Sequence, residues 1–295
     1  MGRHRRISRL PRTTLASRAA LAAGALVPTI ASVGSAHAAT PQSAICTSDE
    51  PGLADKLSED INSALEGSTA TTAISLHDRT TNTTCTLDAD RAFDSASTVK
   101  VTVLATLLWD AQKDDRALTQ EEKDRATAMI TQSDNDATTA LWRQLGVVKV
   151  NGFMRAAGMS DTVLDGEGHW GLTQITANDE EKLLNLVTHA NPVLSEDSRG
   201  YILKLTSEVI PSQRWGTPAG APGDARVHVK NGWLERATNG WRVHSLGAFT
   251  GGDHDYTITV LSQDNATMDD GIANIEGIAR AVHQDLNPPA PSARP

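Results

Sequence analysis

The sequence predicts a mixed α/β (α+β) fold: an antiparallel sheet built from both chain ends and flanked by helices, plus a helical lobe. From Ser97 to about Ile210, apolar residues recur with a spacing near 3.6, which is typical of helices, and strand patterns lie before and after this segment. No Pro-, Gly- or Ser-rich linker and no internal repeat divides the chain. Residues 39–287 are therefore predicted to form one domain, with a functional site in the crevice between sheet and lobe.

The strands of the predicted sheet come from the two ends of this domain. Thr72–His77 is an apolar-rich strand, residues 78–82 form a turn, and Thr83–Leu87 is the hairpin partner. Toward the C-terminus, a pair of strands and then a third are expected over Val227–Lys230, Val243–Thr250 and Tyr256–Ser262. A final helix follows residues 266–270.

The helical segment contains five runs with helical apolar spacing. They are Val101–Trp109, Glu121–Ile130, Ala137–Gln144, Asn178–His189 and Arg199–Val209. Three tryptophans, Trp109, Trp142 and Trp215, are most simply core or lobe-packing residues.

The first 38 residues are predicted to be a signal peptide. Six arginines and no acidic residue accompany an apolar stretch from Ala19 to Ala31, and Ala36-His37-Ala38 provides an A-x-A cleavage site near Ala38. The apolar stretch is shorter than the roughly 20 residues that a membrane-spanning helix needs. We therefore expect export, with a twin-arginine route left open by Arg5-Arg6. A basic arm that binds nucleic acid is the alternative, and it would make the cleavage site accidental.

Charge and cysteine content restrict the class of partner. Without the six arginines of the leader, 21 basic residues remain against 36 acidic ones, which argues against nucleic acid or an anionic membrane surface. We expect a monomer without stable membrane insertion. In an exported protein the two cysteines, Cys46 and Cys85, predict one disulfide, with two separate buried thiols as the alternative. Residues 288–295 are predicted to be a disordered Pro-rich tail.

Three short polar motifs describe one nucleophilic site. They are Ser97-Thr98-Val99-Lys100, Ser133-Asp134-Asn135 and Lys230-Asn231-Gly232. A serine hydroxyl needs a base within reach and donors aimed at the developing oxyanion. If Ser97 begins a helix, Lys100 lies one turn along the same face and its neutral amine can take the Ser97 proton. Burial and a second cation such as Lys230 would lower the pKa of Lys100 from about 10.4.

In their order and context, these motifs resemble the S-x-x-K, S-D-N and K-T-G signature of penicillin-binding proteins and class A β-lactamases. The resemblance covers nearly the whole chain after the leader. It implies that Ser97 is the acylated nucleophile, Lys100 its general base and Ser133 a proton relay. It further implies that Asn135 holds the substrate amide, that Lys230 holds the substrate carboxylate, and that the backbone N–H groups of Ser97 and Trp233 form the oxyanion hole.

The departures from this pattern bear on the reaction. Class A β-lactamases carry an E-x-x-L-N loop whose glutamate activates the deacylating water, and here the loop is short, with Glu167 as the one acid that could substitute. An exposed position in a Gly-rich turn is the alternative for Glu167. Asn231 stands where the K-T-G motif of the family has a hydroxyl residue. Its amide can donate to a carboxylate but cannot relay a proton. Arg242 lies near the position where class A enzymes often hold a substrate carboxylate.

Other catalytic constellations are less well supported. Asp253-His254-Asp255 follows two glycines and fits a hairpin turn better than a metal site, so we expect no metal and no cofactor. A G-x-S-x-G elbow is absent from the sequence, which leaves His169 and His244 as loose alternatives for a Ser-His-Asp hydrolase. Trp170 and Trp233 lie beside the motifs and are predicted to line an apolar substrate pocket.

The sequence thus predicts an exported serine hydrolase that forms an acyl-enzyme on Ser97. The acyl donor would be a β-lactam, a peptide of the cell wall ending in D-alanine, or another amide or ester. The missing loop glutamate argues against fast turnover of penicillins, so carboxypeptidase and esterase activities stay open. The competing hypothesis is a catalytically weakened protein of the same fold that binds β-lactams or cell-wall peptides; Asn231 and the short loop favour it, whereas the intact motifs oppose it.

Overall fold

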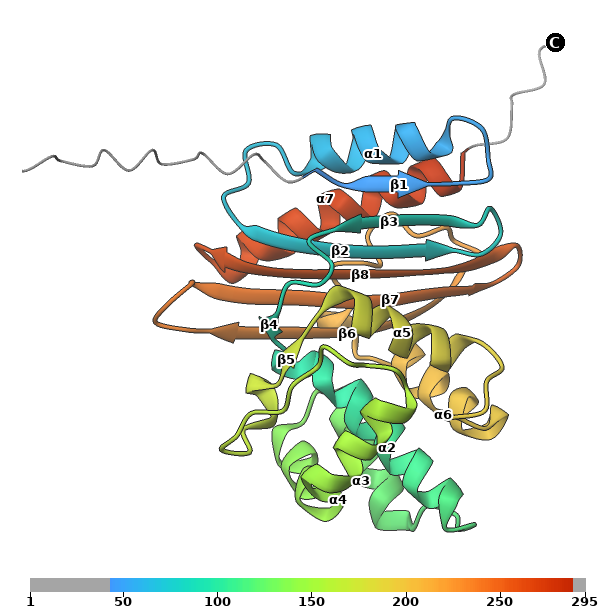
Figure 1. Cartoon of the computed structure of the whole chain (residues 1–295), viewed down its shortest axis with the longest axis vertical. Helices are drawn as coiled ribbons and strands as arrows, with labels where there is room; N and C mark the ends of the chain where they lie inside the picture. The colour runs from blue at the N-terminus through green and yellow to red at the C-terminus, as the bar shows by residue number, and fades with distance from the viewer. Residues whose placement is uncertain (1–42, 289–295) are drawn as a thin grey trace, which may run out of the picture. The chain divides into compact units, whose positions relative to one another are not determined.

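The central element of the computed structural model, which describes residues 43–288, is a six-stranded antiparallel sheet (Figure 1). Its order is β1-β3-β2-β8-β7-β6, and the β2–β8 pair joins strands from the two ends of the chain. The strands are β1 (Ile45–Thr47), β2 (Thr71–Asp78), β3 (Thr83–Leu87), β6 (Arg226–Glu235), β7 (Trp241–Gly251) and β8 (His254–Asn265). The predicted fold class is confirmed. The predicted leader and the last seven residues lie outside the described residues.

Helices cover both faces of this sheet. In Figure 1, α1 and α7 lie on one side, whereas α2 to α6 form a lobe on the other. The helices are α1 (Leu53–Ala64), α2 (Val99–Lys113), α3 (Gln120–Thr131), α4 (Asn135–Ala156), α5 (Ala177–Thr188), α6 (Glu196–Ser207) and α7 (Met268–Leu286). Short connections complete the lobe: β4 (Phe93–Asp94) pairs with β5 (Gln174–Ile175), and 3-10 turns form η1 (Ala96–Thr98), η2 (Trp170–Leu172) and η3 (Pro211–Gln213).

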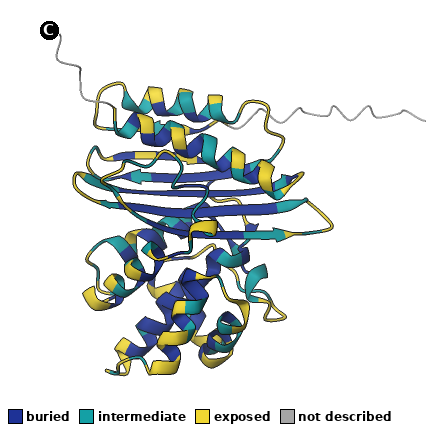
Figure 2. Cartoon of the chain, turned by 180° about the vertical axis from the view of Figure 1, so that it is seen from behind, coloured by how far each residue is buried: buried dark blue, intermediate teal, exposed yellow. Residues whose placement is uncertain are grey.

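The alternation of side chains along β8 separates two cores. Ile258 and Val260 pack toward α1 and α7, whereas Leu261 belongs to the core of the lobe. Thr257, on the lobe face, bonds to Glu181 of α5. Burial follows the same division, with buried residues concentrated along the strands and on the inner faces of the helices (Figure 2). The sheet is therefore covered on both faces, so a substrate can reach the sheet only at its edge strands.

The predicted elements agree with the structure, except that one strand and one helix are longer than the apolar pattern indicates. The β2–β3 hairpin and all five helical runs are present. However, β6 continues five residues past Lys230, because Asn231 and Gly232 interrupt the apolar pattern without breaking the strand. Helix α4 likewise continues past a kink at Gly146, whose φ is 69°. The residues proposed as a hairpin turn, 253–255, lie at the β7–β8 hairpin, with His254 3.0 Å from Asp224.

A disulfide joins Cys46 of β1 to Cys85 of β3, as predicted. The two cysteines are directly opposite each other in the strand pairing, so the cross-link ties the first described strand to the sheet. Within residues 43–288, none of the helices combines the length and apolar character that crossing a membrane requires.

Three consecutive acidic residues at the start of α5 pack under the sheet, with Asp179 and Glu180 buried and Glu181 partly buried. Glu180 has no exposed surface, and neither of its carboxylate oxygens has a hydrogen-bond partner among the described residues. Burial raises the pKa of Glu180 to about 8, and the neighbouring Asp179 adds to this shift. Burial also raises the pKa of Glu181 to about 8, although its bond to Thr257 opposes the shift. The protonated form of Glu180 is therefore favoured in the folded protein at pH 7.

We expect Glu180 to contribute a fall in folding stability as pH rises from about 4.5 to about 8. The folded protein keeps the Glu180 proton over this window, whereas the unfolded chain loses it. The contribution of Glu180 is on the order of 5 kcal/mol across the window. Urea denaturation of wild type and Glu180→Gln at pH 5 and pH 8 measures it. Relative to wild type, the variant should become more stable between pH 5 and pH 8, and an equal change of unfolding free energy in the two proteins would contradict the assignment.

Candidate active site

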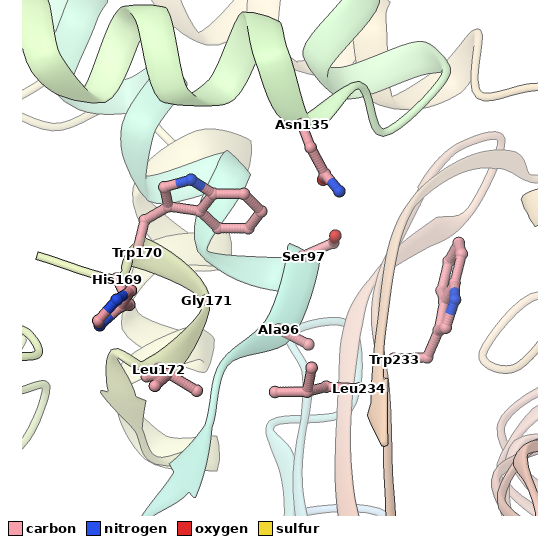
Figure 3. Close-up of a pocket in the computed structure, with 9 residues that line it drawn as sticks. All are labelled: Ala96, Ser97, Asn135, His169, Trp170, Gly171, Leu172, Trp233 and Leu234. Carbon is pink, nitrogen blue, oxygen red and sulfur yellow. The ribbon is translucent and has the colours of Figure 1, made fainter. Parts of the chain in front are cut away.

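Ser97 lies in η1, where the chain passes from β4 into α2. Hydrogen bonds hold this turn: the Ser95 N–H donates to the Thr173 carbonyl at 2.8 Å, and the Thr98 hydroxyl donates to the Ser95 carbonyl at 2.6 Å. Ala96 has a φ of 49°, which is uncommon for a residue with a side chain and costs free energy. The strained turn presents the half-buried Ser97 side chain to a pocket (Figure 3).

Gly232 of β6 approaches this turn at van der Waals distance. A Cβ at Gly232 would lie 2.9 Å from the backbone nitrogens of both Ser97 and Thr98, and 3.1 Å from the Ser95 carbonyl oxygen. A strand residue with any side chain would collide with backbone here, so only glycine permits the contact. Since β6 is an edge strand of the sheet, this contact joins the sheet directly to the nucleophile turn.

Lys100 lies one helical turn beyond Ser97 and is completely buried. Its ammonium nitrogen donates to the Ser133 carbonyl at 2.7 Å, to the Ser133 hydroxyl at 3.0 Å and to Asn135 Oδ1 at 2.8 Å. Among the described residues, no hydrogen bond joins Lys100 to the Ser97 hydroxyl. Ser133 reaches Lys100 because its backbone adopts a φ of 58° immediately before Asp134 caps α4. The first and second motifs therefore meet.

Lys230 of β6 reaches the same hydroxyl from the sheet. Its nitrogen lies 3.0 Å from Ser133 Oγ and 2.7 Å from the Asn231 carbonyl. Burial lowers the pKa of Lys100 to about 8, against a smaller opposing effect of Asp134. Burial also lowers the pKa of Lys230 well below its ordinary value, and the nearby Lys100 lowers it further. One hydroxyl thus bridges two amines whose positive charges are disfavoured.

Asn231, predicted to contact substrate, is instead turned into the protein. Its amide nitrogen donates to the carbonyls of Gln213 at 2.9 Å and Trp215 at 2.8 Å, and its exposed fraction is 1%. The Trp215 ring in turn packs against Trp233, with ring centroids 5.9 Å apart. Asn231 therefore holds the segment that supports Trp233.

A pocket of about 390 Å³ opens in front of Ser97. It is lined by Ala96, Ser97, Asn135, His169, Trp170, Gly171, Leu172, Trp233 and Leu234. Figure 3 shows Trp170 and Trp233 on opposite sides of Ser97, with the Asn135 side chain directed toward the serine from α4. The Trp170 ring centroid lies 4.9 Å from the Lys100 nitrogen, and the indole N–H donates to the Thr139 hydroxyl at 3.2 Å.

The remaining residues singled out from the sequence lie at the edge of the site or have structural partners. The Glu167 side chain is 83% exposed, lies 3.7 Å from His169 Nδ1, and does not line the pocket. His169 lines the pocket, but its ring is directed away from Ser97 and lies 3.0 Å from Asp165 (Figure 3). His244 is buried, and its Nε2–H donates to the Asp94 carbonyl at 2.8 Å. Burial lowers the pKa of His244 to about 4.

Arg242 is also fully engaged. It lies 3.1 Å from Asp94 Oδ2, and its guanidinium donates to the Thr238 carbonyl at 2.6 Å. Its exposed fraction is 5%. Arg242 and His244 thus fasten β4, which leads into the nucleophile turn, to β7 of the sheet.

Sequence reasoning missed several residues of the pocket and its support. Leu172 and Leu234 line the pocket but belong to no polar motif. Each lies within two residues of a tryptophan that was singled out, and that proximity was the available signal. Thr139 anchors Trp170 from a different helix, a contact that only the tertiary structure brings about.

A family model described as "Beta-lactamase enzyme family" matches residues 56–123 and 121–286, which is most of the chain. The chain belongs to this beta-lactamase family. A comparison with curated proteins gave no match.

Solved structures of beta-lactamases have the same fold as this family member. A class A beta-lactamase from Bacteroides cellulosilyticus DSM 14838 has a TM-score of 0.69 at 19% identity, covering 79% of this chain and 98% of that one. A beta-lactamase from Sphaerobacter thermophilus DSM 20745 has a TM-score of 0.67 at 20% identity, covering 80% of this chain and 99% of that one. The structure of PBP-A has a TM-score of 0.68 at 18% identity, covering 79% of this chain and 96% of that one. At these identities the similarity establishes the fold.

Gly232→Ala should disrupt the site of this beta-lactamase family member. The added methyl group would meet backbone atoms of the nucleophile turn, which cannot rotate away, so we expect a loss of about 1–3 kcal/mol in unfolding free energy. Displacement of β6 should also lower the rate of any reaction at Ser97 at least tenfold. Urea denaturation and single-turnover acylation measure the two effects.

Gly223→Ala is the matched control, because a Cβ there would meet nothing within 4 Å. It should leave both stability and acylation unchanged. Equal behaviour of the two variants would show that the approach of β6 to Ser97 carries no constraint.

Proposed function

We propose that this protein is an exported serine hydrolase that forms an acyl-enzyme on Ser97 with a β-lactam, a peptide ending in D-alanine, or another amide or ester. One observation carries the proposal: two buried lysines from opposite sides of the site converge on the Ser133 hydroxyl, beside a pocket that Ser97 lines. Burying two amines costs free energy, and buried titratable groups of this kind are concentrated at functional sites. Export rests on the sequence of residues 1–38.

The reaction begins with proton removal from Ser97. Lys100 has a pKa lowered to about 8, so a substantial fraction of its amine is neutral near pH 8 and can act as general base. Ser97 Oγ then bonds to the carbonyl carbon, and the developing oxyanion is held by the backbone N–H groups of Ser97 and Trp233. Ser133, in contact with both amines, delivers the proton to the leaving group as the carbonyl–leaving group bond breaks.

Deacylation is the slow step in this proposal. No carboxylate side chain lines the pocket, and Glu167 is directed into solvent. The Trp170 ring packs over the Lys100 nitrogen, with its centroid 4.9 Å away. The absence of a lining carboxylate also favours the second candidate, a protein of the same fold that captures β-lactams or wall peptides and releases little product.

Intact-protein mass spectrometry tests acylation. The protein without residues 1–38 is exposed briefly to a chromogenic β-lactam and, separately, to 4-nitrophenyl acetate, while product colour is recorded. We expect wild type to gain the mass of the acyl group from at least one reagent, and Ser97→Ala to gain none. If wild type and Ser97→Ala give the same masses and the same colour with both reagents, the proposal is wrong.

The pH dependence of acylation tests the role of Lys100. Because the neutral amine is required, the acylation rate should rise about tenfold per pH unit below pH 8 and level off above it. Lys100→Arg keeps a positive charge that cannot be removed, and it should lower the rate by about 10³-fold or more. Stopped-flow measurement of the first turnover gives both values. A flat wild-type profile between pH 6 and 8 would assign the base to another group.

A further inference from the structure

We propose that the acyl donor is an uncharged ester or amide whose acyl part is flat and apolar, rather than a substrate that presents a carboxylate to the site. This inference rests on the proposed acylation of Ser97 and narrows its substrate class. Three observations support it: Asn231 and Arg242 are used within the protein, one rim of the pocket is acidic, and the fixed Trp170 indole forms an apolar wall.

The donors on β6 are directed inward. Lys230 is 1% exposed, and its nitrogen bonds to Ser133 Oγ and to the Asn231 carbonyl. Its positive charge is disfavoured both by burial and by the nearby Lys100. Asn231 gives its amide hydrogens to the carbonyls of Gln213 and Trp215. To bind a carboxylate, Asn231 would have to abandon an internal partner.

The arginines beyond this strand are paired with one acid. Arg242 and Arg236 lie 3.1 and 3.3 Å from Asp94 Oδ2, and Arg242 also donates to the carbonyls of Thr238 and Gly240. Releasing Arg242 would leave a buried charge on Asp94 without its closest cation, which is costly. Arg242, which sequence reasoning placed near a substrate carboxylate, therefore stabilises the connection to β4 instead.

The opposite rim of the pocket carries negative charge. Asp165 lies 3.0 Å from His169 Nδ1, and the largely exposed Glu167 lies 3.7 Å from the same atom. Bonds from His169 lower the pKa of Asp165, so this carboxyl stays ionised. Two carboxylates around one imidazole give this rim a net negative formal charge. A substrate carboxylate entering on this side would be repelled.

The pocket is built to hold an uncharged group. Asn135 Oδ1 accepts from Lys100, so the amide nitrogen of Asn135 is left to donate to a neutral carbonyl. Trp170 is fixed by its bond to Thr139, and Trp233 is fixed by its packing on Trp215. The Trp170 indole, held in place beside Ser97, offers a flat apolar surface without an ordering cost on binding, whereas the Trp233 indole extends from the side of β6 away from Ser97 (Figure 3).

With an ester, the step is balanced. The Ser97 Oγ–carbonyl carbon bond forms, the ester C–O bond breaks, and the Ser97 proton passes through Lys100 and Ser133 to the departing alcohol. Water later cleaves the acyl-enzyme and returns the acid and the free serine. Water is the co-substrate, and no oxidant or reductant is needed.

Two matched pairs of 4-nitrophenyl esters test the inference. Valerate and hemisuccinate have acyl groups of similar length that differ in charge, whereas phenylacetate and acetate differ in a flat ring. The rate of nitrophenolate release by wild type, minus that of Ser97→Ala, is normalised to alkaline hydrolysis of each ester. We expect kcat/KM to favour valerate over hemisuccinate and phenylacetate over acetate, each at least tenfold.

The contribution of the aromatic wall is tested by its own substitutions. Trp170→Ala should reduce the phenylacetate-to-acetate ratio at least fivefold, mainly through KM, and Trp170→Phe should restore most of that ratio. A ratio that is the same in Trp170→Ala and wild type would overturn the role of the indole.

The outcomes separate this inference from the proposed function. If Ser97 is acylated but hemisuccinate or a chromogenic β-lactam reacts as well as the uncharged esters, the substrate class is wrong and the hydrolase proposal stands. If no ester and no β-lactam reacts in a Ser97-dependent way, the proposed function fails and this inference fails with it.

Discussion

The contact between Gly232 and the backbone of Ser97 and Thr98 fixes the distance between the sheet and the helical lobe, and the site depends on that distance. Because β6 rests directly on the nucleophile turn, Lys230, two residues earlier on the same strand, reaches the Ser133 hydroxyl that Lys100 also contacts. A side chain at position 232 would widen the gap, and the two amines could no longer share one oxygen. Backbone packing here determines the chemistry that the side chains can perform.

Stability and reactivity are coupled at this site. Burial of Lys100 and Lys230 disfavours their charged forms, and the same burial supplies the neutral amine that the proposed reaction requires. Polar groups that would otherwise meet a substrate anion are used to hold the fold together: Asn231 secures the segment around Trp215, and Arg242 secures β4. The hydrogen bonds that stiffen the pocket thus also lower its affinity for a negatively charged substrate.

Much of the fold and part of the site could be predicted from the sequence, and the division has physical causes. Apolar periodicity depends on local geometry, so the β2–β3 hairpin and the five helical runs were predicted correctly. The short strands β1, β4 and β5 carry too few residues to show a period, and their pairing comes from tertiary contacts. Motif order indicated that Lys100, Ser133 and Lys230 would meet. It could not reveal that Asn231 turns inward, because the direction of that side chain depends on carbonyls 16 and 18 residues away.

The two edges of the sheet are protected in different ways. At one edge, the three-residue strand β1 is tied to β3 through Cys46–Cys85, so few backbone groups are presented and the strand cannot easily detach. At the other edge, β6 is covered by η1 and α6. Open strand edges are the usual sites at which sheets of separate molecules join and aggregate. The contact that assembles the site therefore also limits pairing of the longer edge strand with other molecules, and we expect a variant that loosens this contact to aggregate more readily.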